Sequence, residues 1–150
     1  MTLKSLRTLT ALSVMLCLSS GCATVDSPPA RAVTTTVVEK LAKTTRSWNG
    51  ATLPAYPSGQ PEISILRITI PAGAKLPVHI HPVINAGVLV SGQLTVITGD
   101  GKTLHLSAGD AIVETVDTLH YGVNQGSVPA QIIVVYAGVI DKPITVIESQ

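Results

Sequence analysis

The sequence is poor in aromatic residues and carries almost no net charge. It contains no Phe, one Trp and three Tyr among 150 residues, and its formal charge is +1. Nucleic-acid-binding domains typically combine a basic surface with aromatic side chains on which bases stack, so this composition argues against a nucleic-acid partner. The core must instead be built from Val, Ile, Leu and Ala, which favours β-structure, and the length allows one domain.

Long hydrophobic runs are also absent, with one exception near the N-terminus. Residues 9–18 are apolar and follow Lys4 and Arg7. The run is too short to span a bilayer, and a basic start followed by an apolar stretch is typical of a secretory signal peptide. We therefore predict a signal peptide over residues 1–21 and an exported protein. Without this leader, eight basic residues remain against nine acidic ones, so the mature chain is close to neutral at −1.

Cysteine is scarce, and only one cysteine lies beyond the core of the leader. Cys17 would leave with the signal peptide, so Cys22 has no intramolecular disulfide partner in an oxidising compartment. Residues 18–23 resemble a bacterial lipobox, although Ser19 stands where Leu is usual. The resemblance implies lipidation of Cys22, a bacterial periplasmic location and, because Ala23 follows, anchoring to the outer membrane. Simple cleavage near Ala23 is the alternative.

After the leader, the chain divides into a short tether and one domain. Residues 22–36 are rich in Thr, Ser, Pro and Ala, which predicts a flexible tether. The domain is then predicted over residues 37–150. Its first segment, residues 37–47, has no clear apolar face at helical spacing, so a helix and an edge strand are both open, and we favour the strand.

From residue 63 onward, short β-rich runs alternate with turn residues. The predicted strands are residues 63–70, 77–81, 87–90, 94–98, 103–106, 111–116, 119–123, 130–137 and 144–147. Many short strands at such spacing predict an all-β sandwich or barrel. Residues 88–90 and 132–135 are apolar on both faces of their strands, so something must cover the outer face. A second subunit or residues 37–47 would do so, and we predict a homodimer.

Three of the four histidines are placed so that they can share one metal ion. His79 and His81 lie on the same side of a predicted strand because side chains alternate along it, and His120 follows in a later strand. Three imidazoles can hold a divalent metal. Isolated histidines are more often satisfied polar residues of a core. The fourth, His105, lies on the polar side of an alternating strand and is predicted to be exposed.

The spacing around these histidines forms two patterns that resemble the two motifs of the cupin family. The first pattern comprises Gly73, His79, His81, Asn85 and Gly92, and the second comprises Gly109, Thr115, Asp117, His120 and Asn124. The resemblance covers residues 62–137 and implies a cupin-type jelly-roll β-barrel. It also implies one divalent transition metal (Fe, Mn, Zn or Ni) held by His79, His81 and His120, with the glycines and Asn124 serving as turn and scaffold positions.

Three positions depart from the family pattern. Asn85 stands where the family has Glu, Thr115 where it has Pro, and Asp117 where it often has Gly. Asn85 is either a weak neutral ligand or a residue that caps a turn. With three neutral imidazoles and no carboxylate, a divalent ion would keep a charge of +2 and act as a stronger electrophile.

Glu114 and Tyr121 are further candidates for catalysis. Glu114 precedes the second motif and is either an exposed acid or a carboxylate in the mouth of the barrel that acts as a general base. Tyr121 and Tyr136 could line a pocket, although packing with a hydrogen-bonded hydroxyl is the default for both.

The sequence thus predicts an exported metal-binding cupin with a mononuclear three-histidine site. The resemblance implies a dioxygenase or Lewis-acid enzyme acting on a small organic molecule. The alternative is a non-catalytic module that binds a small ligand or a metal at the cell envelope, because fold alone does not decide between them.

Overall fold

The computed structural model describes residues 34–149, and every regular element in that range is a β-strand. The strands are β1 (Pro61–Ile70), β2 (His79–Ile80), β3 (Ile84–Ser91), β4 (Gln93–Thr98), β5 (Thr103–Ser107), β6 (Ala111–Val113), β7 (His120–Val123), β8 (Ala130–Val139) and β9 (Val146–Ile147). Each predicted strand is present, with ends that differ by a few residues. The all-β prediction is therefore confirmed.

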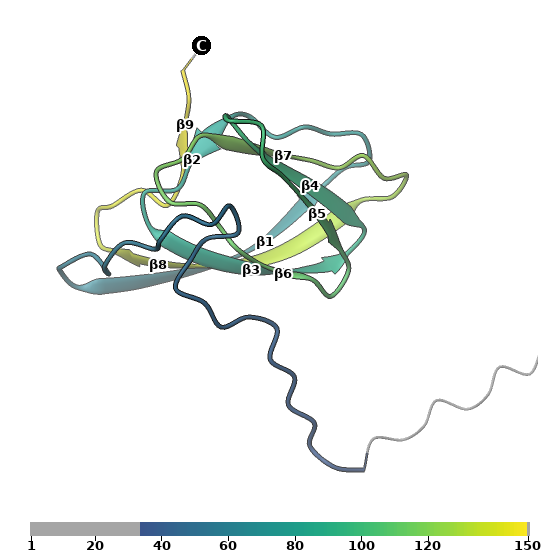
Figure 1. Cartoon of the computed structure of the whole chain (residues 1–150), viewed down its shortest axis with the longest axis horizontal. Helices are drawn as coiled ribbons and strands as arrows, with labels where there is room; N and C mark the ends of the chain where they lie inside the picture. The colour runs from purple at the N-terminus through teal and green to yellow at the C-terminus, as the bar shows by residue number, and fades with distance from the viewer. Residues whose placement is uncertain (1–33, 150) are drawn as a thin grey trace, which may run out of the picture. The chain divides into compact units, whose positions relative to one another are not determined.

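The strands form two antiparallel sheets that lie as two layers (Figure 1). One sheet has the order β1-β8-β3-β6, and the other has the order β5-β4-β7-β2-β9. Neighbours in each sheet are mostly distant in sequence, as in a jelly roll, where successive strands cross between the layers. This arrangement confirms the predicted jelly-roll barrel.

The core lies between the two sheets and is made of aliphatic side chains. Directly opposite residues of antiparallel strands share a face, so the pairs Ile68↔Ile132 and Leu66↔Val134 both point inward from β1 and β8. The buried members of the core are Ile70, Val83, Leu89, Leu94, Val96, Leu106, Ile112, Ala130, Ile132, Val134 and Tyr136. Side chains alternate along β8, and its even-numbered positions face the barrel interior.

The motif glycines occupy turns with positive φ, as the resemblance implied. The φ angles are 73° at Gly73, 75° at Gly92 and 98° at Gly109. Asp117 has a φ of 51°, so this position keeps the left-handed conformation even though it is not Gly. Asn124 is fully buried, and its amide donates to the carbonyl oxygens of Ile70 and Val128. Turn conformation and scaffold bonding are therefore retained.

Residues 37–47 are not the edge strand that we predicted, and they form no helix. They are irregular apart from a bridge between Arg46 and Thr52. Leu41 and Ala42 instead line a groove on the outer face of the β1-β8-β3-β6 sheet, beside Val88 and Ile133. The apolar outer positions of that sheet offer Leu41 a packing surface, which an edge pairing would not. This segment covers only part of the face.

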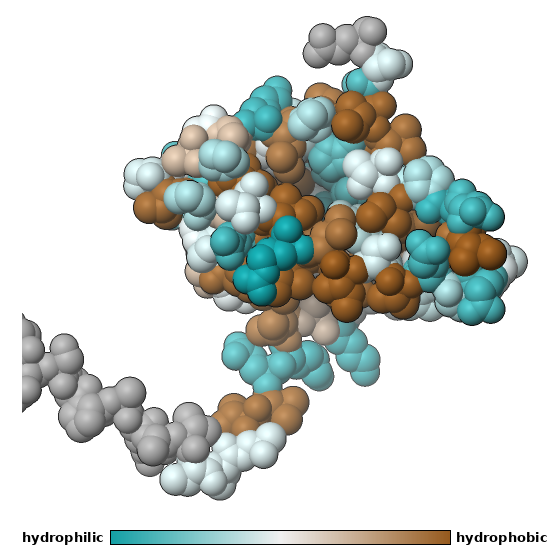
Figure 2. Space-filling view, turned by 180° about the vertical axis from the view of Figure 1, so that it is seen from behind, coloured by the Kyte–Doolittle hydropathy of each residue, from teal (hydrophilic) through white to brown (hydrophobic). Residues whose placement is uncertain are grey.

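Hydrophobic side chains remain exposed around this partial cover. Ile63 and Ile65 of β1 are 59% and 66% exposed, and Val135 of β8 is also exposed. The space-filling view shows hydrophobic residues among hydrophilic ones across the visible face of the domain (Figure 2). Among residues 34–149, no helix is long and apolar enough to cross a membrane. The predicted signal peptide and Cys22 lie outside the described residues.

Candidate metal centre

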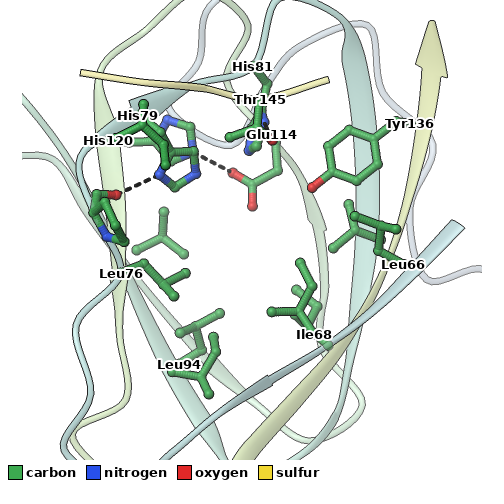
Figure 3. Close-up of a pocket in the computed structure, with 17 residues that line it drawn as sticks. Leu66, Ile68, Leu76, His79, His81, Leu94, Glu114, His120, Tyr136 and Thr145 are labelled. Carbon is green, nitrogen blue, oxygen red and sulfur yellow. Dashed lines mark hydrogen bonds and ion pairs between the residues drawn. The ribbon is translucent and has the colours of Figure 1, made fainter. Parts of the chain in front are cut away.

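The structure brings His79, His81 and His120 together at one end of the barrel interior (Figure 3). His79 on β2 is the direct cross-strand partner of His120 on β7, and His81 follows the end of β2. One ring nitrogen from each lies within 4.8 Å of the others, and the ring centroids are 4.4 to 5.0 Å apart. As predicted, the alternation of side chains along β2 therefore places His79 and His81 on the same side, where both meet His120.

Backbone carbonyls fix the orientation of all three imidazoles. The Nδ1 atoms of His79, His81 and His120 lie 2.7, 2.9 and 2.8 Å from the carbonyl oxygens of Pro77, Ile144 and Thr118. Because a carbonyl only accepts, each Nδ1 carries the proton and donates it. Each Nε2 is then left with a lone pair, which is how histidines are oriented around bound metals in proteins.

Burial also keeps two of these histidines neutral. The pKa of His81 is lowered to about 4, mainly because burial penalises the charged imidazolium. Burial likewise lowers the pKa of His120. A neutral imidazole is the form that binds a metal. Three oriented nitrogen donors in one place fit a divalent transition metal.

Glu114 belongs to this site and is not the exposed acid that we considered for it. Its side chain comes just after β6, is 8% exposed, and points toward the histidines (Figure 3). Its Oε2 lies 3.7 Å from Nε2 of His120 and has no hydrogen-bond partner among residues 34–149. Burial raises the pKa of Glu114 to about 7. Ile112 is also buried, so alternation along β6 and beyond it would have indicated that Glu114 faces inward.

A mostly apolar cavity of about 230 Å³ adjoins the histidines. Its polar groups lie at one end and its aliphatic side chains at the other (Figure 3). The aliphatic lining includes Leu66, Ile68, Ile70, Leu76, Leu94, Val96, Ile132, Val134 and Ile147. A cavity of this kind, with a few convergent polar groups, is typical of a small-molecule site.

Of the two candidate tyrosines, the structure brings Tyr136 to the cavity and leaves Tyr121 outside it. Tyr136 lines the cavity, and its ring centroid is 5.4 Å from that of His81. Tyr121 follows His120 in β7 and therefore points to the opposite face. There, Nζ of Lys75 lies 3.9 Å from the centroid of its ring. Tyr121 is not among the residues that line the cavity.

Asn85 lies within β3, so the hypothesis that it caps a turn is wrong. It is 1% exposed, and within the described part of the chain neither Oδ1 nor Nδ2 has a hydrogen-bond partner. It pairs with Tyr136 of β8, and its backbone oxygen accepts a 3.1 Å bond from the N–H of Glu114. Asn85 therefore faces inward between two residues of the cavity. His105 is exposed, as predicted, and its Nδ1 lies 3.0 Å from Oγ1 of Thr95.

Replacing Glu114 by Gln is expected to stabilise the metal-free protein at pH 8 and to have little effect at pH 5. Since the pKa of Glu114 is about 7 in the folded state against an ordinary 4.5, the folded state holds the proton more tightly. Stability therefore falls as the pH rises from 4.5 to 7, and the full penalty above pH 7 is on the order of 3 kcal/mol. Urea unfolding with a chelator at both pH values measures the difference. Equal differences at pH 5 and pH 8 would contradict the expectation.

Comparison with known proteins supports the fold and the family. Residues 66–136 match the family model described as Cupin domain. A structure of oxalate oxidase in complex with the substrate analogue glycolate is 27% identical, with a TM-score of 0.50, and the match covers 57% of this chain and 45% of that chain. This chain thus spans less than half of that enzyme. A comparison with curated proteins gave no match.

Two further structures share the fold at lower identity. One is an uncharacterized conserved protein with a double-stranded β-helix domain from Klebsiella pneumoniae, with 22% identity, a TM-score of 0.51, and coverage of 63% of this chain and 90% of that one. Another is the DMSP lyase DddQ from Ruegeria pomeroyi, with 19% identity, a TM-score of 0.51, and coverage of 59% and 45%. The family match over residues 66–136 and the jelly-roll sheets support a cupin-type fold for this domain.

Proposed function

We propose that this protein is a metal-dependent enzyme acting on a small organic molecule. The observation that carries the proposal is the position of the three histidines at the polar end of an apolar cavity. A site for metal storage alone has no need of an adjoining cavity. A divalent metal bound there would supply Lewis acidity or the activation of dioxygen, and the aliphatic walls would hold the rest of the substrate.

The lining of the cavity supports a substrate with one polar group and an apolar body. None of the described residues that line the cavity is Lys or Arg. A dicarboxylate would therefore have no protein cation to pair with, and its second carboxylate would face aliphatic side chains. Oxalate oxidase in complex with the substrate analogue glycolate, the 27% identical neighbour, supports chemistry on small molecules in this fold. The cavity supports a more apolar substrate for this chain.

The proposal is tested by metal analysis followed by activity screening. Protein purified without an affinity tag should contain about one transition metal per chain. The iron-loaded and manganese-loaded forms are then screened for dioxygen uptake and for conversion of small molecules that carry one polar group. Metal binding without any turnover would favour the non-catalytic envelope module. Protein that binds no transition metal would contradict both functions.

We also propose that the protein is exported and anchored through a lipid on Cys22. The supporting features are the basic and apolar leader and the lipobox-like residues 18–23. Cys22→Ser is expected to move the protein from the membrane fraction to a soluble or unprocessed form, because no other cysteine follows the leader. Cell fractionation and mass spectrometry of the N-terminus measure this. An unmodified N-terminus at Thr24 in the wild type would instead indicate simple secretion.

A homodimer is proposed from the exposed outer face of the β1-β8-β3-β6 sheet. Ile63, Ile65 and Val135 are exposed there, and a second copy of the chain would bury them. Sedimentation equilibrium of the mature protein is expected to give twice the mass of one chain. The variant Ile65→Asp is expected to shift that mass toward a monomer, whereas Glu62→Gln at the end of the same strand should leave it unchanged.

A further inference from the structure

We infer that Glu114 is the fourth protein ligand of the metal and replaces, from the strand beside β3, the carboxylate that Asn85 lacks. The inference rests on the proposed metal site. It departs from the expectation of three neutral ligands and a retained charge of +2. The ligand set would then be three imidazoles and one carboxylate, with the carboxylate supplied by a different strand from the one that carries it in the family motif.

The first support is the register between β3 and β6. Ala86 pairs with Val113 and Gly87 pairs with Ile112, so the next position places Asn85 opposite Glu114. The N–H of Glu114 donates to the carbonyl oxygen of Asn85 over 3.1 Å. Directly opposite residues share a sheet face, with Cβ atoms about 4.5 to 5.5 Å apart. A carboxylate at either position therefore reaches the same part of the barrel interior.

The second support is the unmatched pair of acceptors between Glu114 and His120. The Nδ1 of His120 donates to the carbonyl of Thr118, so its Nε2 presents a lone pair. The Oε2 of Glu114 lies 3.7 Å from that nitrogen, is buried and accepts no hydrogen bond. Two buried acceptors that face each other repel unless a proton or a metal cation lies between them, and 3.7 Å is too long for a hydrogen bond between the two atoms. Two ligands bound about 2.1 Å from one ion stand roughly 3.0 to 3.4 Å apart, so a small rotation suffices.

The third support is the neutrality of position 85. Asn85 is buried with its amide unpartnered, and it lies between Glu114 and Tyr136 on the inner face. A Glu at this position would place two carboxylates side by side in a buried site, and such like charges disfavour each other. An amide avoids that repulsion. Asn85 and Glu114 are thus a matched pair: the residue on β3 carries a neutral amide, and the residue opposite it, just after β6, carries the carboxylate.

A carboxylate ligand changes which metal the site prefers. Carboxylate oxygens suit Mn²⁺, whereas imidazole nitrogens suit Zn²⁺. Replacing Glu114 by Gln should therefore weaken Mn²⁺ binding more than Zn²⁺ binding. A merely structural role of Glu114 would weaken both metals equally or neither. The ratio of the two affinities is thus a readout that does not depend on any enzymatic activity.

The experiment titrates the mature full chain with Mn²⁺ and with Zn²⁺ by isothermal calorimetry. Glu114→Gln is expected to bind Mn²⁺ about 100-fold more weakly than the wild type, because loss of interactions around metal ligands already costs roughly 10- to 100-fold. The loss for Zn²⁺ should be smaller. Glu62→Gln, which removes an exposed carboxylate from β1, is the matched control and should change neither affinity. Circular dichroism verifies that each variant is folded.

The double variant Asn85→Glu/Glu114→Gln tests the exchange of positions directly. It returns one carboxylate to the inner face from β3, so its Mn²⁺ affinity is expected to recover to within tenfold of the wild type. The electron paramagnetic resonance spectrum of bound Mn²⁺ should change in Glu114→Gln and recover in the double variant. A double variant that binds no better than Glu114→Gln would overturn the exchange between the two positions.

Two other outcomes are decisive. If Glu114→Gln binds both metals as tightly as the wild type, Glu114 is not a ligand, while the three-histidine site stands. If the wild type binds neither metal, the proposed site fails and the inference fails with it. Should Glu114→Gln not fold, Glu114→Asp provides the same comparison, because it shortens the side chain by one methylene and should also lower the Mn²⁺ affinity more than the Zn²⁺ affinity.

Discussion

Each of the variants His79→Ala, His81→Ala and His120→Ala is expected to lose tight metal binding, by about 100-fold or more. Each variant removes one of three oriented imidazoles, whose candidate ligand nitrogens lie within 4.8 Å of one another. The remaining two imidazoles keep their hydrogen bonds to backbone carbonyls, so they stay in place and yet cannot complete the site. Elemental analysis of the purified variants and calorimetric titration with Zn²⁺ measure the loss.

His105→Ala is the matched control for these three variants. His105 is exposed on β5, where its Nδ1 contacts Oγ1 of Thr95, and it does not line the cavity. Its removal changes the histidine content by the same amount without touching the site, so metal binding should be unaffected. Equal metal content in the wild type and in a triple variant of His79, His81 and His120 would remove the basis of the proposed function.

The strands and the histidine cluster could be predicted because they depend on local signals. Turn residues such as Gly92 and Gly109 mark strand ends, and the period of two fixes which side chains share a face. The same rule would have excluded Tyr121, since the residue that follows an inward His120 in a strand must point outward. The position of residues 37–47 could not be predicted from local signals, because it depends on the apolar outer face of the β1-β8-β3-β6 sheet.

The adjacency of Glu114 and Asn85 was harder to predict, because it depends on the register between two strands and not on sequence spacing. Its distance from Asn85 along the chain says nothing of their adjacency, which arises only when β6 pairs with β3. A comparison with the family motif shows only that Asn85 stands where the family has a carboxylate. It gives no information about a carboxylate on a neighbouring strand. The general point is that a missing ligand should be sought at the cross-strand positions opposite it before the charge of the site is assigned.

Gly92→Ala is expected to destabilise the protein by roughly 2 to 5 kcal/mol, combining the cost of overpacking with that of a positive φ. Gly92 lies between β3 and β4 with a φ of 75°, and an added Cβ would lie 2.7 Å from the carbonyl oxygen of Pro129 and 2.8 Å from Cα of Ala130. Both of these atoms belong to the backbone, and Ala130 is fully buried at the start of β8, so neither can move aside. Urea unfolding of the metal-free protein measures the loss.

Gly109→Ala separates the two causes of that loss. Gly109 has a φ of 98°, but apart from Gly109 and its two chain neighbours no atom of the described residues lies within 4 Å of the position of an added Cβ. This variant should therefore lose only the conformational part, roughly 1 to 2 kcal/mol. Since domains of this size are stable by about 5 to 15 kcal/mol, Gly109→Ala should fold normally while Gly92→Ala should be marginal. Equal losses in the two variants would mean that the close approach of the β3-β4 turn to β8 does not contribute to stability.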